Sequence, residues 1–153
     1  MRGMSRPPGA TTRHAARASA LRILYTLEVG RSLRDDVIRD STQAHGLDDD
    51  ASAFARALVL AVDDHRDQID ERIAHHADGY PPDRQTVVDK NILRMVVAEH
   101  GAPFSDATPA ILVSEALELA KTYSTPQAAR FIHGVLGGIL ESDSTERPRR
   151  PNA

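Results

Sequence analysis

Apolar residues recur along most of the chain at intervals of three and four, the repeat that places them on one face of an α-helix. In the first such stretch, at about residues 13–30, the apolar stripe consists of Ala16, Ala20, Ile23, Leu24 and Leu27. Thr12 can cap the start of this helix, and Gly30 can end it. No segment alternates apolar and polar residues over a length that would indicate a strand. The pattern therefore predicts an all-α protein.

Start and stop residues divide the chain into six predicted helices. Thr108-Pro109 and Thr125-Pro126 each combine an N-cap residue with proline at the first helical position, so each begins a helix. Ser32 and Asp48 or Asp49 are the other expected caps, and Gly79-Tyr80-Pro81-Pro82 stops the third helix. The predicted helices span about 13–30, 32–44, 49–79 and 84–100, with two more that begin at 109 and 126.

Three glycines, Gly134, Gly137 and Gly138, fall inside the last predicted helix. Each costs about 0.5–1 kcal/mol relative to alanine in a helix interior. Two explanations stay open for Gly137 and Gly138: the helix ends near Gly137, or a second helix backbone passes too close for a side chain. For Gly134 we favour close packing.

The composition is typical of one small globular domain. The 153 residues are 41% hydrophobic and 27% charged, with only 4% aromatic residues and no Trp, so the core must consist of aliphatic side chains. No apolar run approaches the roughly 20 residues that a membrane span needs. The chain has no cysteine, which excludes disulfides and thiolate metal sites and fits a reducing cytosol. We therefore expect a cytoplasmic protein.

Charge is unevenly distributed along the chain. The net charge of −3 argues mildly against nucleic-acid binding. Residues 1–22 nevertheless hold five arginines and no acid. At 100° per residue, one flank of the first predicted helix carries Arg13, His14, Arg17 and Tyr25. Arginine binds phosphate and tyrosine can stack on an unpaired base, so this flank is a candidate RNA surface. The alternative is a solvated arginine face with Tyr25 half-buried in the core.

Other polar residues indicate no enzyme, cofactor or metal site. Glu115 and Glu118 are spaced like paired catalytic carboxylates, but a solvated helix face with pairing along the helix to Lys121 explains them better. His75 and His76 are adjacent and lack the i, i+4 spacing of a zinc-binding helix. The sequence also has no glycine-rich phosphate loop and no nucleophile elbow. We therefore expect a binding protein.

Four segments of the sequence, in order, resemble the NusB family of transcription antitermination factors. They are Arg13-His-Ala-Ala-Arg17 through Tyr25, Val88-Asp-Lys-Asn-Ile-Leu-Arg94, Ala110 through Lys121, and Phe131-Ile-His-Gly-Val-Leu136. The resemblance covers about residues 12–141. It implies an all-helical fold of about six to seven helices, arranged as two helical subdomains in a single compact domain. That domain is expected at 12–142, between a mobile arm (1–11) and a disordered tail (143–153).

The resemblance also implies partners. Family members pair with the small-subunit ribosomal protein that doubles as NusE. The heterodimer binds the boxA-type RNA of ribosomal RNA transcripts, within the antitermination complex of RNA polymerase. The alternative is a helical protein-interaction adaptor without RNA affinity, which the acidic net charge favours.

The resemblance further implies roles for individual residues. It favours Arg13 and Arg17 as RNA contacts and adds Arg130, which directly precedes Phe131. An ordinary exposed arginine is the alternative at Arg130.

On the fourth predicted helix, the resemblance places Asp89 and Arg94 toward the ribosomal-protein partner, with Asp89 preferred. A structural salt bridge is the alternative for each. His133 stands where the family usually carries Asn, which leaves the role of this position open.

Overall fold

The structure is a computed structural model and describes residues 10–77 and 85–146. Those residues form seven helices and no strand. The helices are α1 (Ala10–Val29), α2 (Arg34–Ala44), α3 (Asp49–Asp64), α4 (Arg66–His76), α5 (Val87–Glu99), α6 (Pro109–Tyr123) and α7 (Pro126–Glu146). The prediction of an all-α fold is confirmed. None of these helices is long and apolar enough to cross a membrane.

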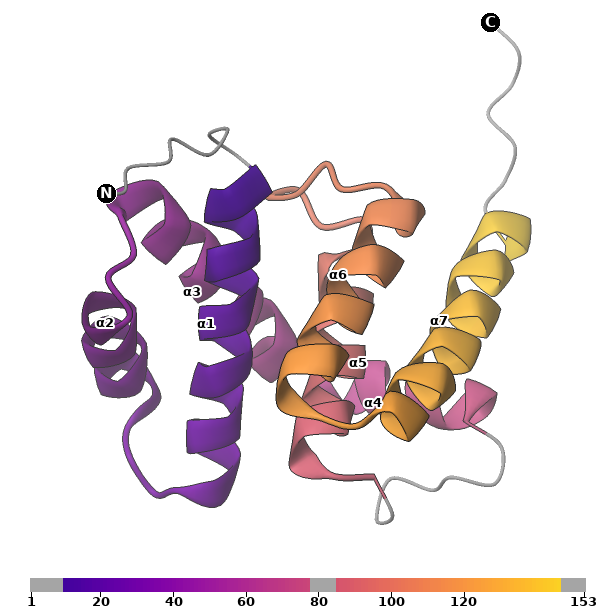
Figure 1. The fold of residues 1–153 in the computed structure, drawn as a ribbon, viewed down its shortest axis with the longest axis horizontal. Coiled ribbons are helices and arrows are strands. Elements are labelled where there is room, and N and C mark those ends of the chain that lie inside the picture. The colour runs from indigo at the N-terminus through magenta and orange to yellow at the C-terminus, as the bar shows by residue number, and fades with distance from the viewer. Residues whose placement is uncertain (1–9, 78–84, 147–153) are drawn as a thin grey trace, which may run out of the picture.

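The helices form two groups that meet at α5. Helices α1, α2 and α3 pack on one another at one side of the molecule, and α4, α6 and α7 lie with α5 at the other (Figure 1). Helix α5 touches α4, α6 and α7 within its own group and both α1 and α3 across the boundary. It is therefore the element through which the two helical subdomains share one core.

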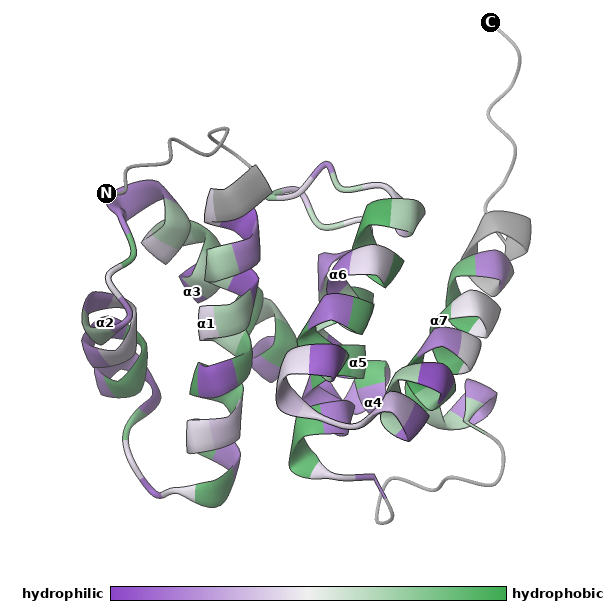
Figure 2. Cartoon of the chain, viewed as in Figure 1, coloured by the Kyte–Doolittle hydropathy of each residue, from purple (hydrophilic) through white to green (hydrophobic). Residues whose placement is uncertain are grey.

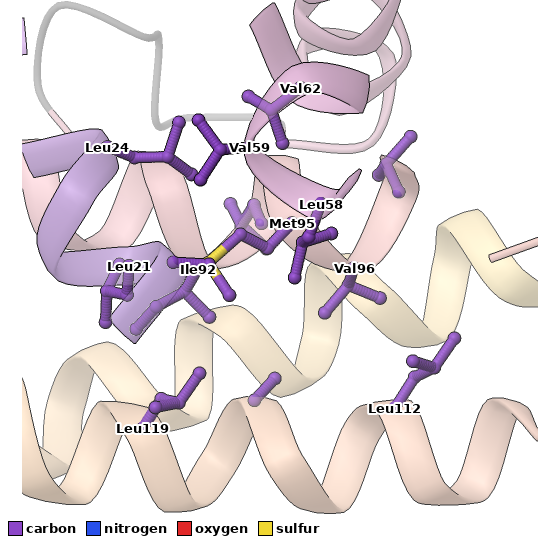
Figure 3. Packing of buried hydrophobic residues seen from close by; sticks show 14 of the residues in the cluster. Leu21, Leu24, Leu58, Val59, Val62, Ile92, Met95, Val96, Leu112 and Leu119 are labelled. Atoms are coloured by element: carbon purple, nitrogen blue, oxygen red, sulfur yellow. The ribbon is translucent and has the colours of Figure 1, made fainter. Parts of the chain in front are cut away.

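The core is aliphatic, as the composition predicts. Figure 3 shows side chains from four helices converging: Leu21 and Leu24 of α1, Leu58, Val59 and Val62 of α3, Ile92, Met95 and Val96 of α5, and Leu112 and Leu119 of α6. Hydrophilic and hydrophobic residues alternate in bands along the helices (Figure 2), as expected for helices with one buried face.

Several of the predicted helix starts are confirmed by their caps. The side chains of Asp48, Thr108 and Thr125 accept hydrogen bonds from the backbone N–H groups three residues further along, at 2.8, 3.2 and 3.0 Å. Two predictions were wrong. Helix α1 begins at Ala10, so Thr12 lies inside it, and the N-cap of α2 is Leu33, which has no capping side chain, in place of Ser32.

The long third helix predicted from 49 to 79 is two helices. The backbone leaves the helical region at His65 (φ −121°, ψ 23°), which ends α3 and begins α4. Val62 and Ile69 are both buried, and their spacing of seven fits an unbroken helix equally well. The break lets α3 pack on α1 while α4 packs on α7. Periodicity alone cannot reveal such a change of direction.

Both boundaries of the expected domain fall inside helices. Helix α7 continues through Gly137 to Glu146, so the suggested early end of this helix was wrong. The rest of the predicted tail and most of the predicted N-terminal arm lie outside the described residues.

Close packing explains only one of the three glycines. Among the described residues, a Cβ atom at Gly134 or Gly137 would have nothing within 4 Å beyond its chain neighbours and the backbone of its own helix, so the close packing expected at Gly134 is not found there. At Gly138 a Cβ atom would lie 3.1 Å from the His76 ring of α4, so the close neighbour is a side chain and no helix backbone.

Candidate nucleic-acid interface

The expected RNA surface begins in the first half of α1, where the structure separates residues that the sequence grouped together. Ala16 and Ala20 are fully buried and seat the helix on the core. Arg13 and His14 are partly exposed on the adjoining flank, whereas Arg17 is buried.

Arg17 is held inside the protein by two carboxylates. Its Nε and Nη2 donate to the two oxygens of Glu99 at 2.9 and 2.6 Å, and its Nη1 donates to Oε1 of Glu115 at 2.9 Å. The side chain of Arg17 is 6% exposed and that of Glu99 is 2% exposed. Burial acts to lower the pKa of Arg17, but the hydrogen bonds and charges of both carboxylates outweigh it and raise the pKa. The predicted phosphate contact at Arg17 therefore has no geometric support.

Arg13 keeps a more accessible position one turn earlier. Its guanidinium lies over the ring of Phe54, 4.2 Å from the centroid, and the rings of Phe54 and Phe104 are T-shaped with their centroids 5.5 Å apart. A cation–π contact of this kind is worth about 0.5–1 kcal/mol at an exposed site. No described carboxylate forms an ion pair with Arg13, so its charge remains available to an external anion.

His14 and Arg17 share one carboxylate. Oε2 of Glu115 lies 2.6 Å from Nδ1 of His14, while the other oxygen accepts from Arg17. The His14 side chain is 46% exposed. The expectation that Glu115 is solvated and paired along its own helix was wrong, because its partners are on α1. Glu118 does pair with Lys121, at 3.6 Å.

Tyr25 lies at the far end of α1 and is exposed. Its exposed fraction of 45% leaves part of the residue accessible to a ligand and part covered by the protein. It lines an open groove of about 390 Å³ together with Leu21, Arg22, Thr26, Val88 and Tyr123. Two tyrosine rings and a cation in one groove can contact both bases and phosphates.

Arg22 is the residue of this groove that the sequence analysis did not select. It is exposed, and no ion pair of its guanidinium is found among the described residues. The sequence feature that could have identified Arg22 is its position three residues before Tyr25, which places both side chains on the same helix face.

Arg130 is exposed on the second turn of α7. Figure 1 places α6 between α1 and α7, the helices that carry Arg13 and Arg130. The chain enters α7 just after Tyr123, which lines the groove. Any shared surface therefore runs through the C-terminal half of α1. His133 is also exposed, so its side chain forms part of the surface of α7.

The two expected partner contacts have partners within the chain. Arg94 is 6% exposed and binds both oxygens of Asp70, at 2.7 and 2.9 Å, and Glu28 at 2.9 Å. Oδ1 of Asp89 accepts from Ser124 Oγ at 2.6 Å. The geometry thus matches the structural alternative for Arg94, and a partner contact at either residue stays a prediction.

Glu28 belongs to the same ion cluster. Burial acts to raise the pKa of this carboxyl, but hydrogen bonds from Lys90 and Asn91 and the charge of Arg94 outweigh it and lower the pKa. Because α1 supplies Glu28 and α5 supplies its partners, this cluster fixes the C-terminal end of α1, as Arg17 fixes the N-terminal half.

Among the residues that the structure describes, no three His, Asp or Glu side chains are grouped so that they could hold a metal ion.

The described residues thus define a small all-helical protein of two helix groups, with partly exposed cations and an exposed tyrosine along its first helix. The chain matches the NusB family over residues 14–141, and it belongs to that family.

Relatives and a solved structure agree with this assignment. The transcription antitermination protein NusB of Desulforamulus reducens is 32% identical over 136 residues, covering 89% of this chain and 94% of that protein. The protein of the same name from Bacillus velezensis is 38% identical over 129 residues, covering 83% and 94%. A solved structure of the antitermination factors NusB and NusE in complex with dsRNA aligns with a TM-score of 0.78 at 27% identity, covering 87% of this chain and 98% of that one.

Proposed function

We propose that this protein binds RNA as a heterodimer with a NusE-type small-subunit ribosomal protein. The RNA is the boxA-type segment of ribosomal RNA transcripts, and the heterodimer acts in the cytoplasm within the antitermination complex of RNA polymerase. The observation that carries the proposal is the groove in which exposed Tyr25 and Tyr123 lie beside Arg22. The solved complex of two related factors with RNA supports it.

The groove and the start of α1 supply different parts of the contact. Tyr25 and Tyr123 present aromatic faces for unpaired bases, whereas Arg13, Arg22 and Arg130 contact phosphates. Three phosphate contacts give only a small gain from counterion release at physiological salt. The isolated protein should consequently bind RNA weakly, and the ribosomal-protein partner should supply the remaining contacts.

For the partner surface we propose the start of α5, where Asp89 lines a small cavity of about 180 Å³ with residues of α7. This surface adjoins the groove through Val88, so RNA and partner can bind side by side.

The test is a titration of labelled boxA-type RNA with the protein alone and with its partner. Affinity should rise markedly with the partner. Arg22→Ala should weaken binding and reduce the slope of log affinity against log salt by about 0.7 to 1. Arg39→Ala is the control, because Arg39 is also exposed but lies on α2 beside Asp36 and Asp40. Equal affinity with and without the partner, and no effect of Arg22→Ala, would contradict the proposal.

The second candidate is a protein-interaction adaptor without RNA affinity. Neutralisation of Arg17 and Arg94 by internal carboxylates favours it, since this leaves fewer free cations than the sequence suggests. The same titration separates the two candidates. An adaptor would retain its protein partner and show no RNA binding at any salt concentration.

A further inference from the structure

The contact between His14 and Glu115 determines which hydrogen-bonding group His14 presents to solvent. A carboxylate that also accepts from an arginine can only be an acceptor. Glu115 accepts from Arg17, which is itself bound to Glu99. Nδ1 of His14, 2.6 Å from the remaining oxygen, must therefore carry a proton and donate it.

As long as the imidazole is neutral, the outward ring nitrogen of His14 has the opposite character. In a neutral imidazole with its proton on Nδ1, Nε2 holds a lone pair and is an acceptor. The side chain is 46% exposed, and no hydrogen bond of Nε2 to a described residue is found. Phosphate oxygens are acceptors and cannot bond to such a nitrogen. The ribose 2′-hydroxyl can donate to it, and DNA lacks this group.

Resting on the proposed function, we infer that His14 is a specificity-determining residue, which accepts a hydrogen bond from a ribose 2′-hydroxyl and so favours RNA over DNA. Arg13, the preceding residue, contacts the phosphate backbone of the same strand. Glu115 is the positioning residue, since it fixes both the orientation of the ring and the location of its proton. Arg17 and Glu99 act through Glu115 by holding it in place.

Two substitutions at position 14 separate the two sides of the ring. His14→Asn places an amide nitrogen near the position of Nδ1, so it can still donate to Glu115 but has nothing at the position of Nε2. His14→Gln reaches the outward position and restores an acceptor there. The probes are a boxA-type RNA oligonucleotide and the DNA of the same sequence, each titrated with the complete heterodimer.

The wild-type heterodimer should prefer RNA, and His14→Asn should weaken RNA binding by roughly two- to tenfold, the value of one hydrogen bond. DNA affinity should not change, and His14→Gln should restore part of the preference. A scan of single 2′-deoxy substitutions in the RNA should find one position that matters for the wild type and has no effect in His14→Asn.

Three results would overturn the inference. If His14→Asn weakens RNA and DNA equally and lowers the salt slope, a protonated ring contacts phosphate. If His14→Asn changes nothing, His14 lies outside the RNA surface. Nitrogen NMR of the free protein, without RNA, can show which ring nitrogen of His14 carries the proton. A neutral ring protonated on Nε2 would contradict the assigned tautomer. Failure of the wild-type heterodimer to bind RNA at all would instead refute the proposed function.

Discussion

Removing the Arg17 side chain should destabilise the protein strongly. Arg17→Met keeps an aliphatic chain of similar length but leaves Glu99, 2% exposed, with a charge and without its cation. Among the described residues, Ser105 Oγ at 2.7 Å is its remaining hydrogen-bond donor. Breaking a buried ion pair from one side typically costs about 3–5 kcal/mol. For a chain of this size we expect the melting temperature to fall by roughly 6–20 °C.

Two further variants separate the charge from the shape of the site. Glu99→Gln leaves Arg17 paired with Glu115, so it should cost less, about 1–3 kcal/mol. The double variant Arg17→Met with Glu99→Met removes both buried charges and should recover much of the loss. Arg34→Met is the matched control, because Arg34 is 40% exposed beside Asp63 and Asp64 and its pairs are hydrated.

The assay is urea unfolding followed by the helical circular dichroism signal, with free energies of unfolding from linear extrapolation. The m-value should stay constant across the series, and Arg34→Met should leave the midpoint nearly unchanged. A free energy of unfolding for Arg17→Met within about 1 kcal/mol of the wild type, at equal m, would refute the reasoning. So would strictly additive effects of the two substitutions in the double variant, because a true pair must show coupling.

Three further predictions concern single sites. Tyr25→Ala should weaken RNA binding by about 1–3 kcal/mol if a base stacks on the ring, whereas Tyr25→Phe should be mild; equal effects in a binding titration would exclude stacking. Glu28 has a folded-state pKa below its ordinary value of 4.5, so it stabilises the fold above that pH and loses its contribution as the pH falls through the folded value. The urea midpoints of wild type and Glu28→Gln should consequently differ at neutral pH and converge below pH 4.5. Alanine at Gly134 or Gly137 should stabilise by about 0.5–1 kcal/mol in thermal unfolding, while at Gly138 the contact with the neighbouring imidazole should remove that gain.

Local sequence signals predicted most of the helices correctly. The cap hydrogen bonds of Asp48, Thr108 and Thr125 join residues only three positions apart, so the local sequence is sufficient to predict them. The break at His65 could not be predicted, because it depends on α4 packing against α7 from a distant part of the chain. Gly134 and Gly137 of α7 show that an apparent packing signal can lack a packing partner among the residues that the structure describes.

The candidate site shows a sharper limit. Helical periodicity places Arg17 at the border of the apolar stripe. The sequence pattern of such a cation is the same whether its side chain faces water or a buried carboxylate. The deciding residue, Glu99, lies 82 positions further along the chain. Arg94 was assigned to the partner surface from the family resemblance, and the acids that bind it, Asp70 and Glu28, come from two other helices, which the local sequence does not reveal. Tyr25, in contrast, is exposed as the RNA hypothesis requires.

The central position of α5 has a consequence for how the molecule opens. Six consecutive residues, Ile92 to Val97, are buried, so this helix has no solvent-facing side along those turns. Its amide hydrogens should exchange with deuterium only when the whole chain unfolds. Helix α2, which packs on α1 and α3 and exposes charged residues, can open on its own and should exchange much faster. The two helix groups should therefore unfold together: melting of α4–α7 would remove α5 from beneath α1 and α3, and melting of α1–α3 would expose the apolar face of α5 that they cover.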